Sequence, residues 1–398
     1  MTNPLLRADA LPAFDEIRPE HVQPAIDTLL ATTDAALERA VGPDTPAEYD
    51  AVSSVLDTAA EHLRFVWGAI GHLNAVADTP ALRAAYNDAL PKVTEQSSRH
   101  AADERLYAKY KAIAKNAACV GSASSLTPAR KQALSNAMRD FVLAGAELQG
   151  EAKQRFQRLQ ELQADLSQKF SEHVLDATDG YACYASTEEL AGVPADAREA
   201  SRAAAAAEGK AGHKVTLHFP SYFPVMQYGE NRALRERLYT ANATRASEMG
   251  PPDQDNSEVM RELIRLRQEE ARLLGYPSYA DVSLVPKMAA SPRQVMDFLR
   301  DLAGRARPHA QRDLAELREF ARTELGIDDL QAWDVPFASE KLKEARYAFS
   351  DQEVKQYFTE PKVLEGLFRI IETLFEVAIR PDSAPVWQDR KSTRLNSS

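Results

Sequence analysis

Residues 256–276 read NSEVMRELIRLRQEEARLLGY, which is the pattern of one amphipathic helix. The apolar side chains recur every three or four positions, as in Val259, Leu263 and Leu266, so they share one helical face. Gly275 follows the last turn, where glycine readily adopts the left-handed conformation that ends a helix. The stretch therefore predicts a helix with one face prepared for packing.

A second and longer helix is predicted after the loop of residues 278–292, which reads SYADVSLVPKMAASP. Ser291 is placed to cap this helix, Pro292 takes its first position, and Gln294 completes a capping box. An apolar stripe then continues to Gly326 through Val295, Leu299, Leu302, Ala306, Leu314 and Leu317. Two long, packed helices follow from these 71 residues alone (256–326).

Most of the remaining sequence has the same helical character. A threonine followed by proline, a strong start signal, stands at Thr79 and again at Thr127. Alternating residues predict a small hairpin between Tyr181–Ala185 and Val215–Phe219, with an alanine-rich helix over Pro194–Gly209 between them. The predicted fold is all-α, with long antiparallel helices in layers and at most one small β-hairpin.

The overall composition limits the classes of function. The net charge of −11 over 398 residues argues against non-specific binding to nucleic acid and to anionic membranes, because both need basic patches. No apolar run approaches the length of a membrane span. Two cysteines, Cys119 and Cys183, do not make a disulfide framework, which favours a reducing compartment. We therefore expect a soluble cytoplasmic protein.

Several segments, in this order, resemble one family of enzymes. They are Leu11–Ile26, His72–Val76, Asn136–Phe141, Leu175–Thr178, Thr216–Met226, the loop of residues 278–292 and Phe337–Lys341. Together they are similar to the thimet-oligopeptidase family of zinc peptidases. The resemblance runs from about Met1 to Trp387, and a run of ordered segments is more specific than a single motif.

The resemblance implies a zinc site that this sequence does not contain. In the family, two histidines of H-E-x-x-H on a helix hold the metal and the glutamate acts as general base. The eight histidines here include no pair four residues apart: His21, His62, His72, His100, His173, His213, His218 and His309. Residues 1–388 are thus expected to form the helical N-terminal part of a two-lobed oligopeptidase, without its catalytic zinc domain. Residues 389–398 do not continue the pattern and are expected to be a foreign tail.

We assign no residue in this sequence as catalytic, cofactor-binding or metal-binding. His213 and His218 are five apart, so on a strand they face opposite sides. Glu262 and Glu269 share a helical face, but Arg265 lies between them, which is typical of a solvated ion-paired surface. Tyr222 and Phe223 form an aromatic turn that is expected to pack against the protein core. Contact of these rings with a bound peptide is the alternative.

Three hypotheses follow. In the first, the chain is an incomplete zinc metalloendopeptidase whose family cleaves short peptides; zinc binds the full-length family member but not this chain, which is inactive alone. An apolar strip near Val363–Trp387 would then be exposed where the missing domain docks. In the second, the chain is a metal-free helical protein that binds peptides or a partner. The third is a purely structural helical scaffold, which the ordered segments disfavour.

Overall fold

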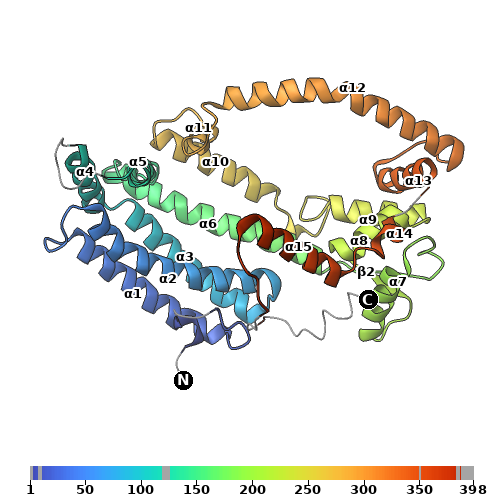
Figure 1. Cartoon of the computed structure of the whole chain (residues 1–398), viewed down its shortest axis with the longest axis horizontal. Helices are drawn as coiled ribbons and strands as arrows, with labels where there is room; N and C mark the ends of the chain where they lie inside the picture. The colour runs from blue at the N-terminus through green and yellow to red at the C-terminus, as the bar shows by residue number, and fades with distance from the viewer. Residues whose placement is uncertain (1–2, 8–10, 119–125, 349–350, 382–385, 387–398) are drawn as a thin grey trace. The chain divides into compact units, whose positions relative to one another are not determined.

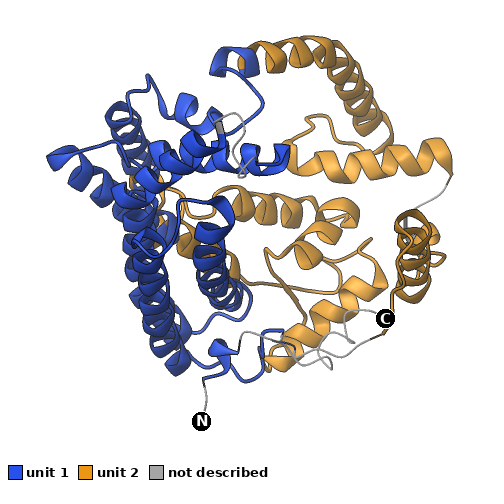
Figure 2. Cartoon of the chain, turned by 60° about the vertical axis from the view of Figure 1, so that its left-hand side comes forward, with its two compact units in different colours: residues 1–169, 259–295, 383–389 blue, residues 170–258, 296–382, 390–398 orange. Residues whose placement is uncertain are grey.

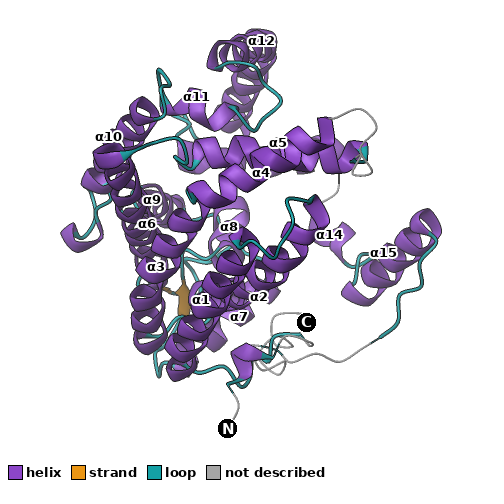
Figure 3. Ribbon diagram, turned by 90° about the vertical axis from the view of Figure 1, so that its left-hand side faces the viewer, coloured by secondary structure: helices purple, strands orange, loops and turns teal. Residues whose placement is uncertain are grey.

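The computed structural model describes residues 3–7, 11–118, 126–348, 351–381 and 386, and they are predominantly helical (Figure 3). In these residues the only sheet has two short strands, so the predicted all-α fold is confirmed. Cys119 and the expected tail at 389–398 lie outside the described residues. The chain divides into two compact units, coloured separately in Figure 2.

Unit 1 comprises residues 1–169, 259–295 and 383–389. Three long helices, α6, α10 and α12, have residues in both units. The described elements of unit 1 are η1 (Pro4–Leu6), α1 (Pro19–Val41), α2 (Tyr49–Val76), α3 (Pro80–Ala101), α4 (Glu104–Ala118), α5 (Pro128–Leu143), most of α6 (Gly150–Asp179), most of α10 (Ser257–Leu273) and α11 (Tyr279–Leu284).

Helices α1, α2 and α3 lie side by side and enclose the main core of unit 1 (Figure 1). Val22 and Ile26 of α1 and Val66 of α2 are completely buried in this core. The predicted start signals are confirmed. The Thr79 hydroxyl accepts a hydrogen bond from the Leu82 amide at 3.2 Å, and the Thr127 hydroxyl accepts one from the Arg130 amide at 3.3 Å. Each cap satisfies an amide that the first helical turn leaves without an intrahelical partner.

Helix α10 confirms the prediction from its apolar spacing. Val259, Leu263 and Leu266 are buried, with 5%, 9% and 0% of their surface exposed. Gly275 has φ +80°, the left-handed conformation that was predicted to end this helix. The next long helix begins at Pro292 with the predicted serine cap, because the Ser291 hydroxyl accepts a hydrogen bond from the Gln294 amide at 3.2 Å. The Gln294 side chain accepts from the Ala290 amide at 2.7 Å, so it does not close the predicted capping box on Ser291.

Unit 2 comprises residues 170–258, 296–382 and 390–398. Its described elements, beyond the ends of α6 and α10, are β1 (Cys183–Ala185), α7 (Ala195–Ala207), β2 (His213–Val215), α8 (Phe219–Tyr228), α9 (Arg232–Ala243), η2 (Pro252–Gln254), most of α12 (Pro292–Glu324), η3 (Ala332–Asp334), α13 (Val335–Tyr347), α14 (Asp351–Lys355) and α15 (Glu360–Phe375).

The predicted hairpin exists, but its second strand was misplaced. Strand β1 pairs antiparallel with β2, with Cys183 opposite Val215 and Ala185 opposite His213. The prediction put the second strand at Val215–Phe219, whereas α8 already begins at Phe219. Two features start the helix there. Pro220 stands in the first turn of α8. The Ser221 hydroxyl accepts a hydrogen bond from the Thr216 amide at 2.9 Å.

A helix that spans a bilayer must be about 20 residues long and predominantly apolar. None of the described helices is long and apolar enough to cross a membrane.

Candidate functional site

In the part of the chain that the structure describes, no group of three or more histidine, cysteine, aspartate or glutamate side chains is placed to hold a metal ion. That the whole chain contains no catalytic, cofactor-binding or metal-binding residue therefore stays a prediction.

The closest histidine pair is occupied by local hydrogen bonds. His213 on β2 is buried, and its Nδ1 lies 3.0 Å from the Arg198 carbonyl oxygen, so Nδ1 carries the proton. Its Nε2 lies 3.3 Å from the Thr187 hydroxyl, which can donate to it. His218 is half exposed and lies 3.0 Å from Asp179. The two rings bind different partners, as expected from their spacing.

The acidic pair on α10 is ion-paired, as predicted. Arg265 binds Glu262 at 2.6 Å and Glu269 at 3.3 Å, and Arg155 of α6 binds Glu269 at 2.6 Å. Hydrogen bonds from Arg155 lower the pKa of Glu269, and those from Arg265 lower the pKa of Glu262. Both carboxylates are therefore held ionised, and neither has the raised pKa of a general acid.

The aromatic turn divides between packing and exposure. Tyr222 packs partly buried against the core formed by the hairpin, α8 and α9. Phe223 is 36% exposed and stacks on Phe219, which is 68% exposed, with ring centroids 4.8 Å apart. The predicted packing role holds for Tyr222, while the stacked pair of phenylalanines presents apolar surface to solvent.

A buried cluster of charged side chains joins α9 to η3 in unit 2. Asp334 is fully buried and accepts hydrogen bonds from Arg232 at 2.7 Å and from Arg235 at 2.8 Å. Arg235 is only 1% exposed, donates to the Gly229 carbonyl at 2.6 Å, and stacks over the Phe337 ring at 4.2 Å. Burial alone would raise the pKa of Asp334, but the hydrogen bonds from the two arginines outweigh it and lower the pKa.

A second buried polar contact connects α8 with α13. Glu340 is 4% exposed and accepts hydrogen bonds from Gln227 at 2.8 Å and from Lys343 at 2.7 Å. The resembled segments Thr216–Met226 and Phe337–Lys341 thus contribute to packed neighbours in unit 2. The cluster of Arg232, Arg235 and Asp334 was not predicted from the sequence, because Asp334 lies 102 and 99 residues from the two arginines. Both arginines of this cluster are paired with Asp334, although the buried Nε of Arg235 has no hydrogen-bond partner, and this pairing indicates a structural role.

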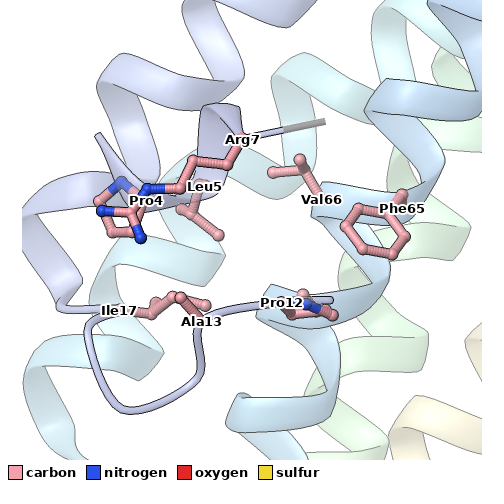
Figure 4. Close-up of a pocket in the computed structure, with 9 residues that line it drawn as sticks. Pro4, Leu5, Arg7, Pro12, Ala13, Ile17, Phe65 and Val66 are labelled. Carbon is pink, nitrogen blue, oxygen red and sulfur yellow. The ribbon is translucent and has the colours of Figure 1, made fainter. Parts of the chain in front are cut away.

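A small pocket near the N-terminus has mainly apolar walls (Figure 4). It is lined by Pro4, Leu5, Arg7, Pro12, Ala13, Ile17, Phe65, Val66 and Ala69. Its one charged side chain, Arg7, is bound to Glu16 at 2.7 Å. The pocket therefore lacks the convergent polar groups that orient a ligand.

Comparison with known proteins gives the class. Residues 225–394 match the model of Peptidase family M3, and residues 26–153 match that of the Neurolysin/Thimet oligopeptidase N-terminal domain. Over these residues the chain is thus similar to the peptidases of family M3.

Within that class, the chain resembles oligopeptidase A over almost its whole length. It is 42% identical to oligopeptidase A of Salmonella typhimurium and 41% identical to that of Escherichia coli, each over 96% of this chain and 56% of the relative. It is 35% identical to a probable cytosolic oligopeptidase A of Arabidopsis thaliana, over 97% of this chain and 56% of the relative. The resemblance predicted from the ordered segments is confirmed. The chain spans about half the length of these relatives.

Zinc content offers a first test. We predict that the purified chain binds no stoichiometric zinc, because it lacks two histidines four residues apart and both ring nitrogens of His213 are engaged. Elemental analysis after zinc reconstitution and dialysis against a mild chelator should give far less than one zinc per chain. A value near one that survives the chelator would contradict the prediction.

Proposed function

We propose that this chain is the helical, channel-wall part of a zinc-dependent oligopeptidase and that it hydrolyses no peptide by itself. The observation that supports this best is the 42% sequence identity with oligopeptidase A, which extends over 96% of this chain. The sequence also contains no H-E-x-x-H motif. The proposal assigns residues 1–388 to that part and residues 389–398 to a tail of other origin, although the match to Peptidase family M3 extends to residue 394.

Zinc is the metal of the proposed complete enzyme, but the described residues here do not fit it. No three suitable donors converge, and the buried acids Asp334 and Glu340 are bound to arginine, glutamine and lysine side chains. In the proposal, the chemistry at the scissile bond belongs to sequence that this chain does not contain. This chain contributes only walls that select substrates by shape.

The proposed substrates are short peptides in the cytosol. The resemblance implies a channel between the two lobes of the complete enzyme, which would admit short peptides and exclude folded proteins. The name of the Arabidopsis relative supports the cytosolic location. The net charge of −11 supports the absence of nucleic-acid and anionic-membrane partners.

A second candidate function is a metal-free helical protein that binds peptides or a partner. The observation that favours it is the exposed, stacked pair Phe219 and Phe223, which offers an apolar contact without any catalytic group.

Sequencing of the source locus with long reads separates the two proposals. A reading frame that runs on from residue 388 to an H-E-x-x-H motif supports the oligopeptidase. A stop codon at the same place in independent isolates, with stable protein of this length in cells, contradicts it and favours the binding protein.

Helix α15 gives a further prediction. Its apolar side chains are exposed, as expected for this region: Val363, Leu364, Leu367, Phe368, Ile370, Leu374 and Phe375. Apolar patches of this kind bind hydrophobic dyes and drive association. We expect the purified chain to bind such a dye and to self-associate in sedimentation experiments, and the double variant Leu367→Glu/Leu374→Glu to do both less.

The matched control for α15 is Arg369→Glu, which makes the same change in net charge without removing apolar surface. It should behave like the parent chain. A parent chain that is monomeric and does not bind the dye would count against the oligopeptidase proposal and for a free-standing protein.

A further inference from the structure

Helix α12 carries an apolar stripe along most of its length. Residues three or four apart place it on one helical face: Leu299, Leu302, Ala306, Ala310, Leu314, Leu317 and Ala321. The stripe keeps this spacing from one end to the other, so the residues are prepared for burial along the whole face.

Only the C-terminal end of the stripe is covered. Leu317 is 7% exposed and Ala321 is completely buried, and both pack with Ile327 and with Ala338 of α13. Nearer the N-terminus, Leu299 is 49% exposed, Leu302 is 53% exposed and Leu314 is 38% exposed. Figure 1 shows α12 as one continuous helix that leads toward α13. A single apolar face is therefore buried at one end and exposed for about four turns at the other.

The opposite face of α12 is suited to water. Asp297 and Arg300 form an ion pair at 3.8 Å, and Asp301 and Arg305 form another at 2.9 Å. Exposed ion pairs within one helix are typical of a solvated surface. The charged side chains thus lie on one face of α12 and the exposed leucines on the other. The helix is amphipathic, and its apolar face is exposed although its polar face already meets the solvent.

We propose that the exposed stripe of α12 is a docking surface for the C-terminal part of an M3 peptidase, the part that oligopeptidase A has beyond the region similar to this chain. The relatives supply the reason for this partner, because the chain covers 56% of their length and nearly half of each is left over. The partner must offer apolar side chains to Leu299, Leu302 and Leu314. This inference rests on the proposed function and adds a second contact surface beside α15.

The test uses the full chain co-expressed with the unmatched C-terminal part of Salmonella typhimurium oligopeptidase A. The variant Leu299→Glu/Leu302→Glu places charge in the stripe, and the control Arg300→Glu makes the same change in net charge on the solvated face. Burial of two leucines corresponds to roughly a hundredfold in affinity. We expect the parent and the control to bind the C-terminal part equally within about twofold, and the stripe variant to bind it at least about a hundredfold more weakly. All three should melt alike, because the altered side chains are exposed.

The outcomes separate docking from the proposed function. Equal binding by the stripe variant, or no assembly of the parent chain, would overturn the docking proposal. Loss of self-association by the stripe variant with unchanged binding of the C-terminal part would also overturn it, and would assign the stripe to a second copy. A complex that assembles through the stripe but shows no chelator-sensitive peptide cleavage would leave docking supported and the proposed function refuted.

Discussion

The purified chain should leave a quenched fluorescent peptide intact, with or without added zinc, over times in which intact oligopeptidase A consumes it completely. Enzymes accelerate such reactions by about 10⁶-fold or more, so this difference is the largest we expect. Amide hydrolysis needs an activated water, and the sequence lacks the H-E-x-x-H motif that the family uses for it. The candidate groups in the described residues are engaged elsewhere: Glu262 and Glu269 are ion-paired and His213 is hydrogen-bonded at both nitrogens.

The measurement compares three samples at equal concentration: this chain, the chain co-expressed with the C-terminal part of the Salmonella relative, and the intact relative. Cleavage that a chelator abolishes should appear only in the second and third samples. Chelator-sensitive cleavage by the first sample would mean that this chain holds the catalytic machinery, and would reject the proposal that the chemistry belongs to the part of oligopeptidase A that this chain does not match.

Local rules account for what the sequence predicted well. The helix starts at Thr79, Thr127 and Ser291 follow from hydroxyl caps, which depend only on residues within one turn. The left-handed end at Gly275 depends on a single residue that tolerates positive φ. The acid–base pairing of α10 was also readable, since side chains three and four apart on a helix are neighbours.

Contacts between distant segments account for what was missed. The position of strand β2 at His213–Val215 is set by its pairing with Cys183–Ala185. The alternation of residue types continues past Val215 toward Phe219, where α8 begins, so it predicted a strand too far along the chain. The binding of Asp334 to Arg235 joins residues 99 positions apart, and no local pattern marks either residue as buried. Sequence periodicity showed that α12 has an apolar face, but it could not show where α13 ceases to cover that face.

Asp334→Asn should lower the free energy of unfolding of unit 2 by about 3–5 kcal/mol at pH 7, because loss of one partner leaves a buried charge uncompensated. The substitution keeps the size of the side chain, so the effect isolates its charge. Arg235 is 1% exposed and would keep its carbonyl acceptor at Gly229 but lose its counter-ion. Urea unfolding followed by the fluorescence of Trp333, in a background with the other two tryptophans replaced by phenylalanine, measures this change. Glu319→Gln, which removes an exposed ion pair with Arg322, serves as the control and should leave the midpoint unchanged.

The pH dependence of the same pair of proteins gives an independent check. The pKa of Asp334 is lowered from its ordinary value of 3.8, because the hydrogen bonds from Arg232 and Arg235 outweigh the effect of burial. A carboxylate with a depressed pKa in the folded state stabilises the protein above its unfolded pKa, and this stabilisation is lost as the pH falls through the folded pKa. The difference in unfolding free energy between the parent and Asp334→Asn should therefore be constant from pH 7 to about pH 5 and shrink progressively below pH 3.8. A difference that persists unchanged in strong acid would mean that the shape of the site, and not the charge of Asp334, holds η3 against α9.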